Sequence, residues 1–229
     1  MTEARIEVSD DPAEAVARVV AEQASRGGSI VLTGGRTPGR AYERAAALQP
    51  DWSDVSVWFG DERCVPPDDE RSNYALARRT LLDRLESDPD VHRIRGELQP
   101  ADAAGEYDRA LDGVELDLLL LGVGADGHIA SLFPGSPQLG VTNRRATSGP
   151  AGLEPWVDRV TLTLPELQSA RRTVVLATGA DKAEAVARAF TGDITEETPA
   201  SLLRAGGSSL EVYLDSDAAS GLDFDRRSG

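Results

Sequence analysis

The chain has 229 residues and a formal net charge of −15 at pH 7, with 39 acidic residues against 24 basic ones. This length allows one large domain or two small ones, with enough core to fold without disulfides. So acidic a chain argues against a nucleic-acid partner, because a phosphate backbone requires a basic protein surface. A phosphorylated small molecule is not excluded, since it needs only a local positive pocket.

The single cysteine, Cys64, excludes an internal disulfide framework and suits a reducing compartment. The first residues, "MTEARIEVSDDP", carry neither a basic leader nor an apolar segment, so no signal peptide is expected. The longest apolar run, near "LDLLLLGVG", is far shorter than the ~18 residues of a membrane-spanning helix. We therefore expect a cytoplasmic protein that does not associate with membranes.

Short apolar segments alternate with longer helical patterns along the chain. Strands are predicted at 4–9, 29–33, 55–59, 116–122, 172–179 and 209–215. Helices are predicted from Pro12 to just before Gly27, through "AYERAAAL", over "NYALARRTLLDRL" and from "ADKAEAV" onward, with Asp11 and Ser72 as caps of the first and third. This alternation indicates an α/β three-layer sandwich, Rossmann-like, with a mostly parallel central sheet and helices on both faces.

No internal repeat or long linker divides the chain, so a single domain is expected over residues 1–214. Residues 142–155 are predicted to form a loop inside it, and residues 215–229 a mobile C-terminal tail. Ligands of such sheets bind beyond the carboxyl ends of the strands. The segments that follow the predicted strands are therefore the candidate functional segments.

The segment "GGRTP" follows the strand at 29–33. Gly34 and Gly35 let the backbone approach a ligand, Thr37 offers a hydroxyl, and a helix beginning near Pro38 attracts an anion with its free N–H groups. The segment matches neither a Walker A loop nor GxGxxG, and an ordinary strand-to-helix turn uses the same residues. Both interpretations, a phosphate cradle and a simple turn, stay open at this point.

Two further segments supply cations after predicted strands. "GDER" places Asp61 and Arg63 after the strand at 55–59, and a guanidinium can grip a phosphate with two parallel hydrogen bonds. A solvated charge cluster is the alternative. Lys182, the only lysine, falls in the first turn of a helix, where a cation is unfavourable unless an anionic ligand offsets the helix dipole. A surface lysine is the alternative there.

The glycine-rich segment "GVGADGHIASLFPG" follows the most apolar strand. His128 lies two residues after Asp126, close enough for the carboxylate to orient the imidazole and stabilise its protonated form. A histidine that only bonds loop backbone is the alternative, but its position after a strand favours a functional role. Ser131 leaves a Ser–His nucleophile pair conceivable, whereas His92 is expected to be structural or exposed.

Other catalytic chemistries find little support in the sequence. Two histidines and one cysteine offer no cluster with metal-ligand spacing, and no GxSxG elbow exists for a serine hydrolase. The favoured assembly is a general base that activates water beside a phosphorylated substrate.

Five segments resemble, in the same order, the motifs of the 6-phosphogluconolactonase family: "TGGRTP", "WFGDERCVPPDDERSNY", "GVGADGHIASLFPGS", "RVTLTLPELQSAR" and "GADKAEAV". The resemblance covers roughly residues 5 to 215. It implies a cofactor-free hydrolase of the oxidative pentose phosphate pathway, with an α/β fold and a relationship to glucosamine-6-phosphate deaminase. It implies no metal, and a phosphorylated sugar lactone as the partner of a monomer or weak homodimer.

By this resemblance the catalytic histidine is His128 and its neighbouring aspartate is Asp126. The phosphate-side residues are Gly34, Gly35, Thr37, Arg63 and Lys182, and Asp61 lies near the sugar. Arg36 stands where many members carry a small polar residue, so it either adds a phosphate contact or points outward.

Two rival functions share these motifs. The deaminases of the superfamily carry a glutamate at the place of Phe133 and typically lack the arginine found here as Arg63, so both residues favour the lactonase. A non-catalytic sugar-phosphate sensor is the other rival, and the intact Asp126–His128 pair argues against it.

Overall fold

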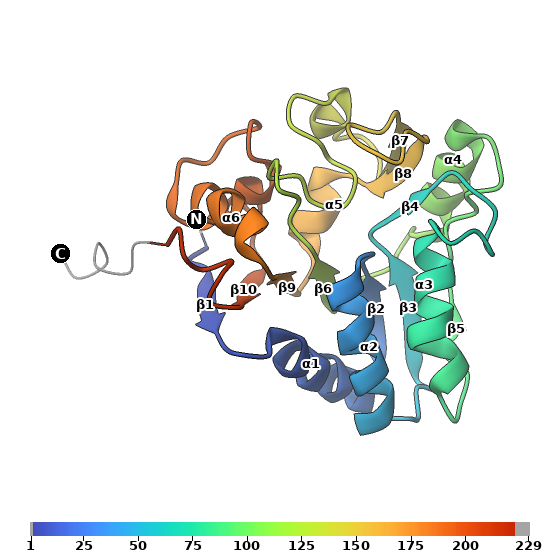
Figure 1. The fold of residues 1–229 in the computed structure, drawn as a ribbon. Coiled ribbons are helices and arrows are strands. Elements are labelled where there is room, and N and C mark those ends of the chain that lie inside the picture. Colours follow the sequence, from blue (N-terminus) through green and yellow to red (C-terminus); the bar gives the residue numbers. More distant parts are fainter. Residues whose placement is uncertain (1, 223–229) are drawn as a thin grey trace.

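A parallel sheet forms the middle of the molecule in the computed structural model, which describes residues 2–222 (Figure 1). Seven strands lie in the order β1-β10-β9-β6-β2-β3-β5, and every pairing is parallel. The strands are β1 (Arg5–Val8), β2 (Gly28–Leu32), β3 (Val55–Phe59), β5 (Asp90–Val91), β6 (Leu118–Leu121), β9 (Arg172–Ala177) and β10 (Ser209–Leu214).

The connections of this sheet reverse direction between β2 and β6. From β2 the chain proceeds to β3 and β5 on one side, then returns to β6 on the other side of β2 and continues to β9 and β10. Such a reversal opens a crevice outside the carboxyl ends of the two central strands, where ligands bind in doubly wound folds. The loops that follow β2 and β6 meet at this crevice.

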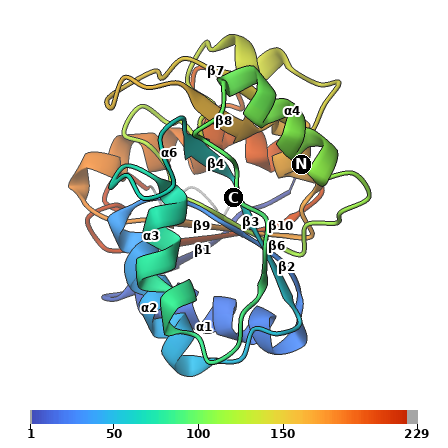
Figure 2. The same cartoon turned by 90° about the vertical axis from the view of Figure 1, so that its right-hand side faces the viewer.

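Helices cover both faces of the sheet. In Figure 2 the sheet crosses the middle of the view, with α1, α2 and α3 on its lower side and α4 and α6 on its upper side. The helices are α1 (Pro12–Arg26), α2 (Arg36–Leu48), α3 (Asn73–Thr80), α4 (Pro100–Ala110), α5 (Leu164–Ser169) and α6 (Ala183–Thr191). The predicted single-domain α/β sandwich is therefore confirmed.

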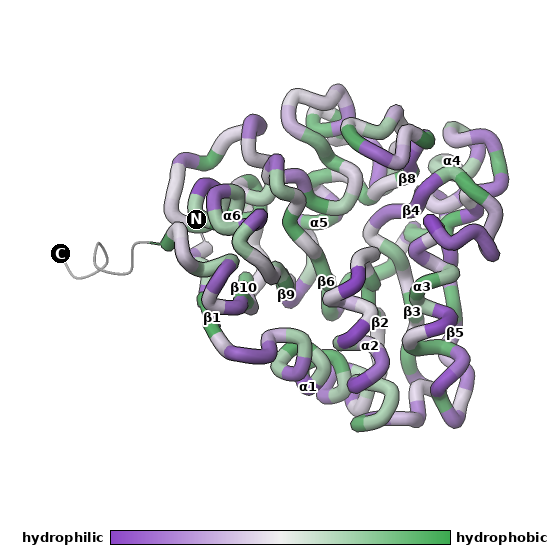
Figure 3. Tube along the Cα trace, viewed as in Figure 1, coloured by the Kyte–Doolittle hydropathy of each residue, from purple (hydrophilic) through white to green (hydrophobic). Residues whose placement is uncertain are grey.

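The core lies along the sheet, where strands covered on both faces are apolar throughout. All four leucines of β6 are buried, and the strand pairs with β2 and β9. In Figure 3 the central strands are coloured as hydrophobic, whereas hydrophobic and hydrophilic residues alternate along α1. This burial on both faces is why the strands read as continuous apolar runs rather than as alternating patterns.

The residues predicted to begin and end α1 do so in the structure. The Asp11 side chain accepts a hydrogen bond from the backbone N–H of Glu14 at 3.2 Å, and Pro12 begins the helix. Gly27 ends it with a φ of 73°, a conformation that glycine adopts without strain. None of the helices within residues 2–222 has the length and hydropathy to cross a bilayer.

A second sheet of three antiparallel strands was not predicted. Its order is β4-β8-β7, with β4 (Asp61–Arg63), β8 (Arg159–Leu162) and β7 (Ala146–Gly149). The "GDER" segment is thus a strand itself, and the predicted loop at 142–155 contains β7. "GDER" does follow β3 as predicted, but the sequence indicates no strand at either place, because both strands are short and partly polar. β4 also pairs with a strand far along the chain, with Asp61 opposite Thr161.

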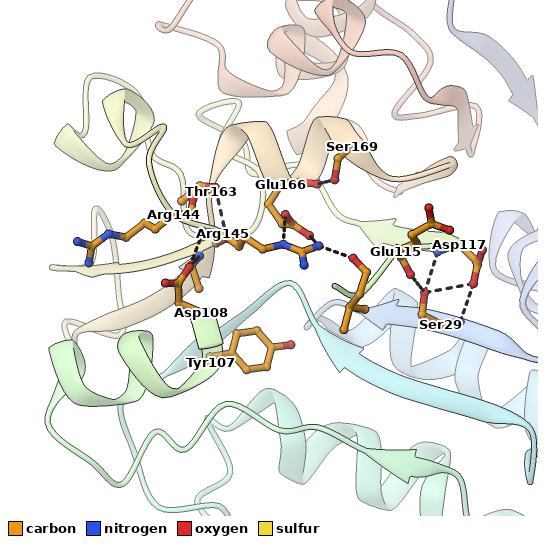
Figure 4. A network of polar contacts seen from close by, with 12 residues as sticks. Ser29, Tyr107, Asp108, Glu115, Asp117, Arg144, Arg145, Thr163, Glu166 and Ser169 are labelled. Atoms are coloured by element: carbon orange, nitrogen blue, oxygen red, sulfur yellow. Dashed lines mark hydrogen bonds and ion pairs between the residues drawn. The ribbon is translucent and has the colours of Figure 1, made fainter. Parts of the chain in front are cut away.

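A polar network fixes this second sheet to the helices above the main sheet (Figure 4). Arg145, next to β7, forms an ion pair with the buried Glu166 of α5 at 2.7 Å. Its backbone N–H donates to Asp108 of α4 at 2.6 Å, and its guanidinium donates to the carbonyl oxygen of Val114. The network thus anchors the β7 edge of the second sheet, and β4, with Asp61 and Arg63, forms the opposite edge.

Two further segments differ from expectation. Residues 215–222, expected in the mobile tail, form turns in which Ala218, Ala219 and Leu222 are buried, and the rest of that tail lies outside the described residues. The helix predicted over "NYALARRTLLDRL" is divided: α3 ends at Thr80, and a 3-10 turn occupies Leu82–Arg84.

Candidate active site

Two adjoining cavities occupy the crevice at the carboxyl ends of β2 and β6. The first, of about 250 Å³, contains His128 and is called the His128 cavity; it is also lined by Asp61, Arg63, Asn73, Ala130 and Leu153, among others. The second, of about 340 Å³, lies over the start of α2 and is called the cradle; it is lined by Arg36, Thr37, Thr178 and Asp181, among others. Gly34, Gly35 and Lys182 line both. The predicted site residues other than Asp126 all line one cavity or both.

The cradle is built on the N-terminus of α2. Gly35 precedes the helix with a φ of 112° and offers no side chain to cap it, so the first-turn N–H groups of Arg36 and Thr37 have no partner within the helix. The Thr37 and Thr178 hydroxyls are hydrogen-bonded at 2.8 Å. Free N–H groups at a helix N-terminus, with the positive end of its dipole, bind anions.

Lys182 supplies a positive charge at the boundary of the two cavities. It directly precedes α6, and its ammonium lies 3.2 Å from the carboxylate of Asp181, which is mostly exposed. The Arg36 side chain is exposed and makes no ion pair with any residue between 2 and 222. The cradle therefore combines two cations with the α2 N-terminus.

His128 is oriented by Asp126. Its Nδ1 lies 2.6 Å from Asp126 Oδ1, and its backbone N–H donates to the same oxygen at 3.1 Å. Donation from Nδ1 leaves Nε2 as the unprotonated ring nitrogen, and Nε2 makes no hydrogen bond within the described chain. A Cβ at Gly124 would lie 2.0 Å from His128 Nδ1, so only glycine allows this approach.

The surroundings of His128 suit a base that gains a proton. Partial burial disfavours the charge of Asp126, but hydrogen bonds from the His128 ring and backbone outweigh it and hold the pKa of Asp126 below its usual range. Asp126 therefore stays ionised beside the imidazole at neutral pH. The Phe133 ring packs against the imidazole, with 4.8 Å between the two ring centroids. A phenyl ring carries no acid or base, so His128 has no second titratable group on that side.

Asp61 is a buried carboxylate in the wall of the His128 cavity. Its Oδ2 accepts a hydrogen bond from Ser131 Oγ at 2.6 Å, and its Oδ1 accepts one from Asn73 Nδ2 at 3.0 Å. Ser131 is thus bonded to Asp61 and not to His128, and the alternative of a Ser–His nucleophile pair finds no support in this geometry.

Arg63 lines the His128 cavity from β4. Its Nη1 donates to the carbonyl oxygen of Arg71 at 2.5 Å, while its Nε is buried with no hydrogen-bond partner. Arg63 therefore brings a guanidinium, a group with five N–H donors, to the wall of the His128 cavity, where it can bind an anionic or hydroxylated ligand.

The sequence did not indicate Asn73 as a site residue, and it did not indicate that Ser131 bonds Asp61. An asparagine beside the cap Ser72 carries only the signal of a helix start, so its contact with Asp61 could not be inferred. His92, in contrast, is placed as expected: it stacks on Trp58 at 4.0 Å and pairs with Asp90, and lines neither cavity. Within residues 2–222 no group of three His, Cys, Asp or Glu side chains could hold a metal ion.

The sequence as a whole matches a known family. Residues 3–212 match the family described as "Glucosamine-6-phosphate isomerases/6-phosphogluconolactonase". The chain belongs to this family.

Similar proteins within the family carry the lactonase name. A 6-phosphogluconolactonase of Streptomyces coelicolor is 38% identical, with 92% of this chain and 88% of that protein covered. One of Mycobacterium tuberculosis is 37% identical, with 90% of each covered. The solved structure of 6-phosphogluconolactonase from Trypanosoma brucei matches with a TM-score of 0.85 at 29% identity, over 97% of this chain and all of that one. The prediction of an enzyme of the 6-phosphogluconolactonase type is confirmed.

A structure described as a monomeric glucosamine-6-phosphate deaminase matches equally well, with a TM-score of 0.85 over 96% of this chain and 100% of that one. Its sequence is only 21% identical, so this likeness shows the shared fold alone.

Proposed function

We propose that the protein hydrolyses 6-phospho-D-glucono-1,5-lactone to 6-phospho-D-gluconate, as in the oxidative pentose phosphate pathway. The observation that carries this proposal is the hydrogen bond of 2.6 Å between His128 Nδ1 and Asp126, which leaves Nε2 free in a cavity that adjoins an anion cradle. The names of the similar proteins support the same substrate.

The cradle and the His128 cavity divide the substrate between them. The phosphate lies at the α2 N-terminus beside Lys182, which lines both cavities, and the lactone ring extends toward His128. Arg63 donates to the phosphate from the wall of the His128 cavity. Binding energy from the phosphate then places C1 of the lactone beside the base, although the phosphate takes no part in the reaction.

The reaction uses one water molecule, and His128 first takes a proton from it and later gives that proton to the leaving oxygen. Nε2 of His128 removes a proton from water as the water oxygen bonds to C1, which gives a tetrahedral oxyanion and an imidazolium stabilised by Asp126. The oxyanion collapses, the bond between C1 and the ring oxygen breaks, and the imidazolium returns its proton to that oxygen. The product acid then ionises and His128 is neutral again.

The deaminase alternative needs a further acid–base group near the ring. Here the Phe133 ring lies 4.8 Å from the His128 ring, in the place where that group is expected. This contact supports hydrolysis of a lactone over ring opening of an amino sugar.

Substitution of the base tests the mechanism. We expect His128→Ala to lower kcat for lactone hydrolysis about 10²- to 10⁴-fold, the usual contribution of a positioned general base. His92→Ala, which removes the histidine stacked on Trp58, is the matched control and should keep the wild-type kcat. A His128→Ala enzyme that still hydrolyses the lactone at the wild-type rate would show that His128 is not the base.

A further inference from the structure

Asn73 lies between the two halves of the site. It is the first residue of α3, only 3% exposed, and it lines the His128 cavity together with Gly34 of the cradle and Asp61 of β4. Gly34 and Asp61 come from segments that follow different strands, β2 and β3. Asn73 contacts both.

The amide nitrogen of Asn73 fixes Asp61. Nδ2 donates to the carbonyl oxygen of Asp61 at 2.8 Å and to its Oδ1 at 3.0 Å, so both amide hydrogens are used. Ser131 Oγ donates to the other carboxylate oxygen at 2.6 Å. With both oxygens held, the carboxylate has one orientation, and its remaining lone pairs are available to a sugar hydroxyl in the cavity.

The amide oxygen of Asn73 faces Gly34. Oδ1 is buried and accepts no hydrogen bond, yet a Cβ built on Gly34 would lie 2.1 Å from it. A Cα hydrogen of Gly34 therefore points at this oxygen, in the manner of a weak Cα–H···O contact. The backbone of Gly34 is not in the left-handed region, so the contact with Asn73, and not the backbone conformation, is what requires glycine here.

The buried Glu62 holds Asn73 in this position. Its carboxylate accepts hydrogen bonds from the backbone N–H groups of Asn73 at 2.7 Å and Tyr74 at 2.9 Å, and from Ser72 Oγ at 2.8 Å. Burial raises the pKa of Glu62, and these hydrogen bonds oppose the rise. A carboxylate at the α3 N-terminus also complements the helix dipole. Backbone and side chain of Asn73 are thus both fixed.

We propose that Asn73 is a positioning residue that links the phosphate cradle to the sugar half of the site, through Gly34 on one side and Asp61 on the other. It acts through these two residues and does not take part in proton transfer. This inference rests on the proposed function, because it concerns the same site.

A double-mutant cycle between Gly34 and Asn73 tests the link. The methyl group of Gly34→Ala meets the Asn73 amide, so the cradle loop must move, and we expect the Kd for inorganic phosphate to rise at least tenfold. In Gly34→Ala with Asn73→Ala the obstruction is gone, so phosphate should bind more tightly than to Gly34→Ala alone. Asn73→Ala alone should weaken phosphate binding and lower kcat/KM for the lactone about tenfold or more, since small displacements of a site are costly.

Arg78→Gly is the control for simple weakening of α3. Arg78 is an exposed residue of the helix whose ion-pair partner is Asp83, so it contacts neither Gly34, Asp61 nor Glu62. Glycine inside a helix is unfavourable, so this variant should lower Tm while leaving the Kd for phosphate unchanged. The proposal is overturned if the Gly34→Ala and Asn73→Ala losses simply add, or if Asn73→Ala changes Tm as Arg78→Gly does and nothing else.

The double-mutant cycle is measured in two ways: as the Kd for inorganic phosphate, by calorimetry, and as kcat/KM for the lactone. An enzyme that binds phosphate but does not hydrolyse the lactone would contradict the proposed function, while the phosphate cycle would still decide the role of Asn73. An enzyme that hydrolyses the lactone with additive losses would contradict the role of Asn73 alone.

Discussion

His128 and Lys182 lie at opposite ends of the bound substrate in the proposed arrangement, so their substitution should affect different steps. His128 acts on the attacking water, and its partner Asp126 keeps Nδ1 occupied at 2.6 Å. Lys182 borders the cradle, where a charged hydrogen bond to phosphate contributes to binding and not to proton transfer.

Removal of the lysine tests this division. Hydrogen bonds to charged groups contribute about 1.5–3 kcal/mol, so Lys182→Ala should raise KM for the phosphorylated lactone roughly 10- to 100-fold with little change in kcat. Hydrolysis of an unphosphorylated δ-lactone should barely change. Arg40→Ala also removes one positive charge, but from the exposed side of α2, and should change neither KM nor kcat for the phosphorylated lactone. Equal losses on both substrates for Lys182→Ala would refute a phosphate contact.

The sequence predicts some of these residues better than others. The pairing of His128 with Asp126 follows from their two-residue spacing and from glycines that let the chain turn. The contacts of Asn73 and Ser131 with Asp61 could not be predicted, because they join segments 12 and 70 residues apart in the chain.

Two buried tyrosines hold the strand ends that carry the site. At the end of β2, Thr33 N–H donates to the Tyr42 hydroxyl at 2.9 Å, and that hydroxyl donates to Thr33 O at 2.8 Å. Tyr107 of α4 does the same for Phe59 at the end of β3, with distances of 2.8 and 2.9 Å. Each hydroxyl satisfies backbone groups at the point where the chain leaves the sheet.

Loss of one such hydroxyl should destabilise the protein. Tyr42→Phe leaves the buried N–H and C=O of Thr33 without partners, which costs about 1–3 kcal/mol in the free energy of unfolding. Tyr74→Phe is the matched control, because the Tyr74 hydroxyl makes no hydrogen bond within residues 2–222. Urea unfolding of both variants measures the difference, and equal stabilities would show that the Tyr42 hydroxyl contributes nothing.

Elements are predictable from sequence where burial dictates composition. The apolar runs of β2, β3, β6 and β9 indicate strands because both faces are covered. β4, with the sequence "DER", and β7, with "ATSG", carry no such pattern. Their strand conformation comes from pairing with β8, which the order of residues alone does not reveal.

At the scale of the molecule, an anionic substrate must bind to a protein with a net charge of −15. The fold makes one crevice locally positive, because it brings Arg63 and Lys182 there from distant segments, together with the N-terminus of α2. The alternation of strands and helices predicts that a crevice exists. It does not give the strand order that puts the β2 and β6 loops side by side.

The most direct test of the proposed activity is the rate at which the full chain hydrolyses freshly generated 6-phosphogluconolactone, measured against the spontaneous rate, with ammonia release from glucosamine 6-phosphate measured in parallel. The His128–Asp126 pair, with Phe133 beside it, predicts hydrolysis far above the spontaneous rate and no ammonia. Lactone hydrolysis at the spontaneous rate, together with release of ammonia from the amino sugar, would contradict the proposed lactonase activity.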